Sequence, residues 1–403
     1  MGGIYFMAEM KKIVKILAAV CGSLVLTVAF AACGEGEEKP VSKKTHDPIT
    51  LEVTGKPGTY EPHNFVDGKC TMCDETTIFS QDSIAKDSIV STPCDQQGTI
   101  TKITYSTDAY PEYEYATDGV VTKTAYVYTP YGYDAEDKDT KYDVLYLLHG
   151  KGLNEEYWFA QGEEGSQFYP GSNIYPNGYG TNNVIDTMMK SGDSVKAIIV
   201  TPTFYLPGEN GKTDSSDEIM NVGLAGFEDE LLNDLMPYIA KNYNTYAEVT
   251  DDMDETQVKE ALTSNRAHQG YAGLSMGALE SYSIIWKDCL DYFAYIGTYS
   301  GGTSLEEAQA IAEAANTTYK DDAIGFWYVG LGSAETNTTY PGDPFGCYRT
   351  LLSGIDRLQS GSDLSAGDNC QFVKCNGTGH NYSSWITALY NSMMVFFQAD
   401  LSK

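Results

Sequence analysis

Positively charged residues are scarce in this 403-residue chain. It carries 26 lysines and arginines against 56 aspartates and glutamates, which gives a formal net charge of -30. A surface this acidic repels nucleic acid and anionic lipid headgroups, so we expect neither as a direct partner. The hydrophobic content of 42% is still enough for a substantial core, and the length allows one large domain or two smaller ones.

The cysteines cannot form a complete disulfide framework, because an odd number of them, seven, follows Cys33. Cys70 and Cys73 have C-x-x-C spacing, and His63 and Cys94 could complete a small zinc site with them. A disulfide to Cys94, or reduced thiols, fits the same spacing equally well. We rank a metal site below these alternatives and expect no cofactor.

The N-terminal region contains a long apolar run, residues 16–32, which follows the basic stretch MKKIVK and precedes Cys33. This order predicts a secretory signal, and FAAC at 30–33 resembles a bacterial lipobox, whose cysteine is lipidated. Residues 29–31 can also be read as an ordinary cleavage site, or the segment stays uncut although it is short for a membrane span. We predict a bacterial cell-surface lipoprotein that contacts the membrane only through a lipid anchor on Cys33.

Composition divides the chain into a signal peptide at 1–33, a tether with a small cysteine-containing segment at 34–95, and a domain at 96–403. Within the last part, apolar strands alternate with helical patterns. Strands are expected at 98–107, 121–130, 142–150, 196–202, 266–274, 293–300, 324–332 and 370–377, and helices at 227–243, 278–286, 304–316, 347–360 and 384–401. This alternation predicts a mostly parallel central sheet with helices on both faces.

The stretch GYAGLSMGALESY places Ser275 between Gly273 and Gly277, after an expected strand and before an expected helix. A tight strand-to-helix turn would lift the serine hydroxyl into the open as a nucleophile, and glycines lack the side chains that would collide there. Gly-x-Ser-x-Gly alone is a weak signal. The chain must also supply a base, an acid and an oxyanion hole.

Only five histidines are available as the base. His380 lies in a glycine-rich loop between the last expected strand and the last helix, where the base follows serine and acid in hydrolases built on such a sheet. His46 and His63 lie in the N-terminal segments, and His149 ends an expected buried strand. His268 begins the strand that leads to the serine, so we expect it to be structural.

The acid should lie at the carboxyl end of a strand between the serine and the base. Glu335 follows the expected strand at 324–332, and Asp343 is a nearby rival. We choose Glu335. Asp321 and Asp322 precede that strand and are therefore at its wrong end.

An oxyanion hole needs two backbone N–H groups aimed at the developing negative charge. Met276 should provide one, and Lys151 or Gly152 in the HGKG loop should provide the other. Trp158 and Trp385 flank the expected site in the sequence. Each could stack on a phenolic acyl group or a sugar, and each could equally belong to the core.

Five blocks of sequence, taken in order, carry a resemblance to a known family. They are YLLHGKGLNEEYW (146–158), FEDELLNDLMPYIAKNY (227–243), RAHQGYAGLSMGALES (266–281), GLGSAET (330–336) and GTGHNYSSWITALYN (377–391). Over about residues 97–400 the chain resembles the esterase D-like branch of α/β-hydrolases. The likeness is greatest to carbohydrate esterase family 1, the bacterial feruloyl and acetylxylan esterases of plant cell-wall degradation.

The resemblance implies an α/β-hydrolase fold with Ser275 as nucleophile, His380 as base and the carboxylate after the GLG strand as acid. The family usually has Asp as this acid, whereas this chain has Glu335. At the position of Ala278 the family often has Gly. We therefore expect a cofactor-free serine esterase that cleaves feruloyl (hydroxycinnamoyl) esters of plant hemicellulose. An acetylxylan esterase, or a non-catalytic carbohydrate-binding surface lipoprotein, is the alternative.

Overall fold

The computed structural model describes residues 51–52, 65–66, 69–70, 78–159, 180–335, 342–361 and 363–401. All of them belong to one compact unit, Thr45–Lys403. The predicted signal peptide, the lipidation site Cys33 and the tether lie outside the described residues, as do His63 and Cys73 of the weak metal candidates.

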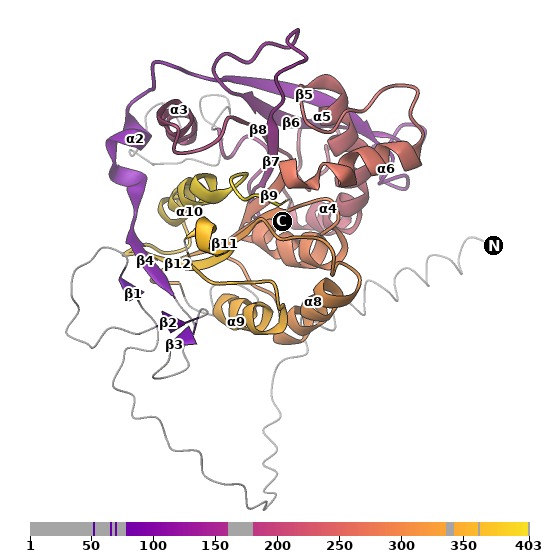
Figure 1. Cartoon of the computed structure of the whole chain (residues 1–403). Coiled ribbons are helices and arrows are strands. Elements are labelled where there is room, and N and C mark those ends of the chain that lie inside the picture. The colour runs from indigo at the N-terminus through magenta and orange to yellow at the C-terminus, as the bar shows by residue number, and fades with distance from the viewer. Residues whose placement is uncertain are drawn as a thin grey trace, which may run out of the picture. The chain divides into compact units, whose positions relative to one another are not determined.

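A ten-stranded sheet runs through the unit (Figure 1). In spatial order its strands are β1 (Leu51–Glu52), β4 (Phe79–Asp82), β12 (Cys370–Asn376), β11 (Phe326–Gly332), β10 (Tyr295–Tyr299), β9 (Gln269–Leu274), β7 (Asp143–Leu148), β8 (Ala197–Thr201), β6 (Val121–Thr129) and β5 (Thr99–Thr107). Neighbours pair in parallel except at β5–β6 and β6–β8. The predicted mostly parallel sheet is therefore confirmed. A separate small sheet pairs β2 (Phe65–Val66) with β3 (Lys69–Cys70).

The described helices include all five predicted ones and two others, at Thr181–Ser191 and Glu255–Ser264, in segments where none was predicted. They are α2 (Ser88–Ser91), α3 (Thr181–Ser191), α4 (Asp217–Glu230), α5 (Met236–Asn242), α6 (Glu255–Ser264), α7 (Met276–Glu280), α8 (Leu305–Thr317), α9 (Pro344–Gly354) and α10 (Tyr382–Val395), with short 3-10 segments η1 (Ile84–Lys86), η3 (Arg266–His268) and η5 (Leu364–Ala366) and π-helical segments η2 (Leu231–Leu235) and η4 (Ser281–Trp286). None of the described helices is long and apolar enough to cross a membrane.

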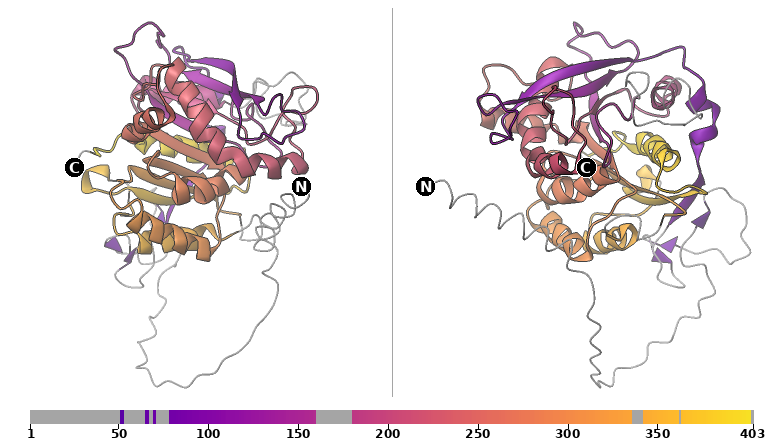
Figure 2. Two further views of the ribbon diagram at one scale, coloured as in Figure 1. Left: turned by 90° about the vertical axis from the view of Figure 1, so that its right-hand side faces the viewer. Right: turned by 180° about the vertical axis from the view of Figure 1, so that it is seen from behind.

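The central strands are apolar on both faces because helices cover both. Along β7, Val144, Tyr146 and Leu148 join one buried cluster, while Leu145 and Leu147 join the other. This alternation follows from the two-residue period of a strand. One cluster is completed by α4, α5, α8 and α9, and the other by α3 and α10. These two groups of helices lie on opposite sides of the sheet in Figure 1, and the turned views in Figure 2 agree.

Residues before position 96 also contribute to the sheet. β4 pairs in parallel with β12, with Phe79 opposite Val373. The following turn is fastened to α10, because the Ile84 N–H donates to the Thr387 hydroxyl at 3.1 Å. The sheet therefore includes residues that precede position 96, where the composition had placed the start of the domain. β4 lies next to the two-residue edge strand β1, and only one of its four residues is buried, so it does not need the apolar run that marks the central strands.

The helix expected at 227–243 is interrupted by a π-helical segment, η2, at Leu231–Leu235. Pro237 follows immediately, in the first turn of α5. The backbone stays helical through Leu235 and Met236, so Pro237 removes one helical N–H donor, and the wider π-helical turn before it accommodates the misfit. This accounts for a proline within an otherwise helical pattern.

Candidate active site

Ser275 stands on the turn between β9 and α7 with φ 54° and ψ -108°. A non-glycine residue in this region of backbone conformation is strained, and surrounding contacts must hold it there. The Ser275 N–H donates to the Tyr299 carbonyl at 2.8 Å, and the Ser275 carbonyl accepts from the Leu279 N–H at 3.0 Å. Both neighbours therefore fix the turn.

The two motif glycines are required by close backbone approach. A Cβ on Gly273 would lie 2.5 Å from the carbonyl carbon of Gly277, and one on Gly277 would lie 2.6 Å from the His149 carbonyl oxygen. Neither position has room for a side chain. The neighbouring Ala278 is fully buried, and its methyl packs against Gly301. A Cβ on residue 301 would lie 2.6 Å from the Ala278 Cβ, so the glycine leaves room for this methyl.

The structure brings the predicted serine, histidine and acid together. His380, in the loop after β12, accepts from the Ser275 hydroxyl through Nε2 at 2.9 Å and donates from Nδ1 to Glu335 Oε2 at 2.8 Å. The His380 side chain is 25% exposed, whereas that of Glu335 is completely buried. In this tautomer the imidazole can take the serine proton, and the carboxylate stabilises the imidazolium that results.

The buried Glu335 carboxylate has partners for both of its oxygens. Oε1 accepts from the Ser300 hydroxyl and from the Gly332 N–H, each at 2.7 Å. These bonds offset the cost of burying the charge and fix the direction of the oxygen that faces the imidazole. The rival acid, Asp343, instead caps α9 by accepting from the Gly346 N–H at 2.9 Å.

Two backbone segments meet beside Ser275 as an oxyanion hole requires. Met276 is the first residue of α7, where a helix leaves its N–H groups without intrahelical acceptors. Opposite lies the loop 149–152 after β7, and a Cβ on Gly150 would be only 2.9 Å from the Ser275 Cβ. The Gly152 N–H donates to the Tyr205 hydroxyl at 2.8 Å. This leaves the Lys151 N–H as the better of the two predicted donors from this loop.

The loop is supported by the buried His149, which the sequence analysis placed at the end of a buried strand without giving it this role. His149 is bound at Nδ1 to the Gly150 carbonyl at 2.8 Å and at Nε2 to the Thr203 hydroxyl at 2.7 Å. Burial lowers the pKa of His149 to about 3, so its ring stays neutral. Tyr205 stacks parallel to it with ring centroids 5.7 Å apart. The available signal was the pair Thr203 and Tyr205 directly after β8, which ends at the same edge of the sheet as β7.

Solved structures resemble this domain closely in architecture. A structure described as FAE superposes with a TM-score of 0.57 at 26% identity, covering 78% of this chain and 93% of that one. The feruloyl esterase module from Clostridium thermocellum, complexed with sinapinate, gives 0.54 at 25% identity, covering 79% and 95%. A CE1 ferulic acid esterase from Anaeromyces mucronatus, at 20% identity and 0.51, covering 79% and 98%, shares the fold. The domain is an α/β-hydrolase.

Curated relatives of the hydrolase are xylan-degrading enzymes. Endo-1,4-beta-xylanase Y of Acetivibrio thermocellus is 29% identical over 316 residues, which is 76% of this chain and 24% of that protein. The endo-1,4-beta-xylanase/feruloyl esterase of Xylanibacter ruminicola is 27% identical over 284 residues, 68% of this chain and 29% of that protein. The hydrolase thus spans less than a third of each relative's length.

No family model matches the chain. The resemblance to carbohydrate esterase family 1 is nevertheless confirmed by the feruloyl esterase structures. Together with the geometry around Ser275, these relatives support the interpretation of the hydrolase as a serine carboxylic ester hydrolase.

The two predicted tryptophans of the hydrolase have different surroundings. Trp385 meets the His380 ring edge-on, with centroids 5.2 Å apart, and its Nε1–H finds no hydrogen-bond partner among the described residues. Trp158 is fully buried, and its Nε1–H donates to the Leu148 carbonyl at 3.3 Å. Trp385 therefore borders the triad, and both tryptophans belong to the same buried cluster.

The remaining candidates lie away from the triad. Cys94 is a partly exposed free thiol whose sulfur accepts from the Gln96 N–H at 3.4 Å. Of Cys70 only the backbone, in β3, is described. No group of three or more His, Cys, Asp or Glu side chains that could hold a metal occurs within the described part of the hydrolase. His268 pairs with Asp143 at 2.7 Å, at the start of β9, which fits the structural role expected of it.

Proposed function

We propose that this protein is a serine carboxylic ester hydrolase that removes feruloyl groups from plant hemicellulose. The observation that carries the proposal is the hydrogen-bonded row Ser275–His380–Glu335, with distances of 2.9 and 2.8 Å, in a domain similar to feruloyl esterase modules. The preference for a hydroxycinnamoyl group over other acyl groups rests on the names of those relatives.

In the proposed first step, Ser275 Oγ attacks the ester carbonyl carbon while His380 Nε2 accepts the serine proton. The carbonyl oxygen becomes an oxyanion facing the N–H groups of Met276 and Lys151. The intermediate then collapses. The bond from carbonyl carbon to sugar oxygen breaks, His380 returns its proton to that oxygen, and the acyl group stays on Ser275.

In the second step water replaces the sugar alcohol. His380 accepts a proton from the water as its oxygen attacks the acyl-serine carbonyl, and the same amides face the second oxyanion. Collapse breaks the bond to Ser275 Oγ, which regains its proton from His380, and the free acid leaves. Every proton in this cycle passes through Nε2, so no metal or cofactor is needed.

The function is tested by hydrolysis of methyl ferulate and of acetylated xylan, with Ser275→Ala as the matched control. Release of ferulate by the wild type and not by the variant is expected. Release of acetate alone would identify an acetylxylan esterase. A fluorophosphonate probe provides an independent test, because it reacts with an activated serine. Absence of labelling at Ser275 would instead favour the non-catalytic carbohydrate-binding protein.

We also propose that the protein is exported and held at a bacterial cell surface by a lipid on Cys33. The proposal is supported by the basic, apolar and small-residue order of residues 10–33. Expression of wild type and Cys33→Ala in a bacterial host, with a radiolabelled fatty acid in the medium, tests it. Label in the wild type alone, with the wild type in the membrane fraction, is expected; equal partition of the two forms would contradict it.

A further inference from the structure

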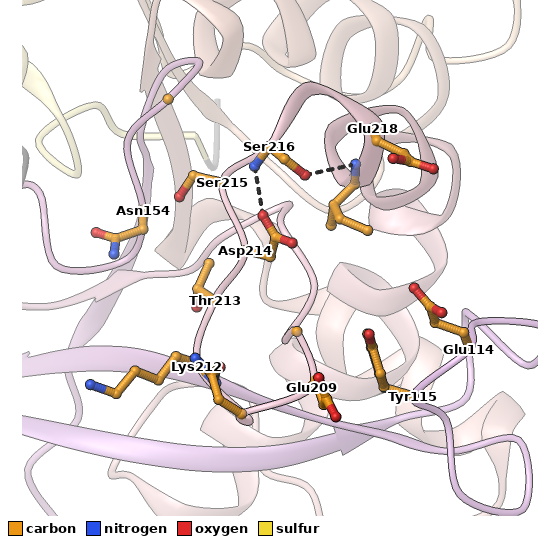
Figure 3. A pocket seen from close by; sticks show the side chains of 14 residues that line it. Glu114, Tyr115, Asn154, Glu209, Lys212, Thr213, Asp214, Ser215, Ser216 and Glu218 are labelled. Atoms are coloured by element: carbon orange, nitrogen blue, oxygen red, sulfur yellow. Dashed lines mark hydrogen bonds between the residues drawn. The ribbon is translucent and has the colours of Figure 1, made fainter.

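A polar cavity of about 1320 Å³ opens beside the oxyanion loop and has no part in the chemistry above (Figure 3). Its lining comes from the loop at 114–115, from Gly152 and Asn154, and from the segment 208–219. Gly152 is two residues from Gly150, so their Cα atoms are at most about 7 Å apart. Since Gly150 packs directly against Ser275, the cavity begins close to the nucleophile.

The wall formed by residues 206–214 is fastened to the body of the domain. The Tyr113 hydroxyl donates to the Pro207 carbonyl at 2.9 Å. The Thr213 hydroxyl lies 3.0 Å from each oxygen of the buried Glu155 carboxylate. A wall held at both ends is organised before a ligand arrives, which lowers the entropic cost of binding.

Tyr115 offers the aromatic surface of the cavity. It is 41% exposed, and the buried Tyr113 ring supports it edge-on at a centroid distance of 5.6 Å. Figure 3 shows Tyr115 entering from its own loop on one side, with Asn154 on the other side of the 208–216 turn. A tyrosine face accepts the apolar C–H face of a sugar ring, while amides and hydroxyls around it can bond to sugar hydroxyls.

The cavity is acidic around this ring. Its lining contains Glu114, Glu209, Asp214 and Glu218 against a single cation, Lys212. The charge of Glu114 raises the pKa of Tyr115, and Glu209 and Asp214 add to the effect, so these carboxylates lie near the ring. Such a field repels anions. It is compatible with neutral sugars and unfavourable for chains that carry uronic acids.

We propose that this cavity binds the alcohol part of the ester, a neutral glycosyl chain, with a sugar ring against Tyr115. The inference rests on the proposed function, because that function places an ester next to Gly152. Binding at a distance from the reacting bond contributes to kcat/KM only for substrates long enough to reach it. The cavity therefore distinguishes oligosaccharide esters from small alkyl esters.

The first test compares Tyr115→Ala with the wild type on methyl ferulate and on a feruloylated arabinoxylan oligosaccharide. We expect kcat/KM to fall about tenfold on the oligosaccharide and to remain within about twofold on methyl ferulate. Tyr131→Ala is the matched control, because Tyr131 is 50% exposed and lies outside the cavity lining. Equal losses on both substrates, or none on either, would overturn the subsite. A wild type inactive on both would contradict the proposed function instead.

A second test measures binding without catalysis, so it shows whether the cavity is a glycosyl subsite even if the wild type is inactive on both substrates. The Ser275→Ala protein is titrated with an unesterified arabinoxylan oligosaccharide and, separately, with an oligogalacturonide, and binding is followed by calorimetry. Binding of the neutral chain alone, lost in Ser275→Ala/Tyr115→Ala and kept in Ser275→Ala/Tyr131→Ala, is expected. No binding of the neutral chain, or binding that ignores the Tyr115 change, would show that the cavity is not a glycosyl subsite.

Discussion

The Gly277 N–H donates to the His149 carbonyl at 3.1 Å, and this bond joins the start of α7 to the end of β7. The two segments that it joins carry Met276 and Lys151, whose N–H groups are the candidate oxyanion donors. The spacing between those donors is therefore set by a backbone contact that only glycine permits. The motif glycine serves the oxyanion hole as much as the serine turn.

Gly277→Ala should separate these two segments. Its Cβ would lie 2.6 Å from the His149 oxygen, so either the start of α7 or the end of β7 must move. We expect kcat on an ester substrate to fall at least about a hundredfold, the cost of losing one oxyanion donor in other hydrolases. Gly132→Ala is the control: its positive φ of 81° makes alanine strained, but nothing lies within 4 Å. It should lose stability and keep kcat.

Tyr205→Phe should act on the oxyanion loop without touching the substrate. It removes the hydroxyl that accepts from the Gly152 N–H at 2.8 Å, so the loop gains freedom and the Lys151 amide is less well placed. We expect kcat to fall about tenfold with KM for methyl ferulate nearly unchanged. Tyr348→Phe, which removes a buried hydroxyl bonded to Ser360 at 2.8 Å, is the matched control. A rise in KM at constant kcat would contradict the positioning role.

Glu335→Gln should lower kcat, whereas Asp343→Asn should not. The amide cannot stabilise an imidazolium and can force the wrong histidine tautomer, so Glu335→Gln should lower kcat by up to about 10⁴-fold. Asp343→Asn should leave kcat unchanged and lower the free energy of unfolding by less than about 1 kcal/mol, since asparagine also caps helices. Steady-state kinetics and urea unfolding of both variants check the pair. Loss of activity in Asp343→Asn alone would reverse the assignment of the acid.

Glu280 should make the hydrolase less stable as pH rises. Burial raises the pKa of Glu280 to about 8 in the folded protein, from 4.5. Above pH 4.5 the unfolded chain releases this proton first, so the contribution to the free energy of unfolding falls until about pH 8. Glu280→Gln should then be more stable than the wild type at pH 7 by up to about 3 kcal/mol. The advantage should shrink toward pH 4.5.

Thermal unfolding at several pH values measures this difference. Glu255→Gln, an exposed substitution of the same type, is the control and should leave the pH dependence unchanged. An advantage of Glu280→Gln that is constant from pH 4.5 to 8 would show that the carboxyl group does not titrate in this range.

The sequence was sufficient to predict the central strands and the row of three polar side chains. Ser275, Glu335 and His380 each follow a strand, and the carboxyl ends of parallel strands meet at one edge, so chain order alone brings them together. The support of the oxyanion loop could not be predicted in this way. The bond from Gly152 to Tyr205 joins residues 53 apart, and it depends on how two loops pack, which leaves no periodic pattern.

The start of the domain also could not be predicted from composition. β4 reads FSQD, and only Phe79 of its four residues is apolar, yet it pairs with four residues of β12. Hydrogen bonding to a neighbour, rather than burial on both faces, defines such a strand. Pairing partners are a property of the folded arrangement, and the local sequence does not specify them.

The position of β4 has a practical consequence for recombinant work. A shortened chain beginning at residue 96 would lack the strand that covers β12. The freed backbone groups of β12 would then offer a template for pairing with another copy, which is a known route to aggregation. A shortened version of the protein for expression should therefore begin before Ile78. We would attribute insoluble product from later start sites to the unpaired edge of β12.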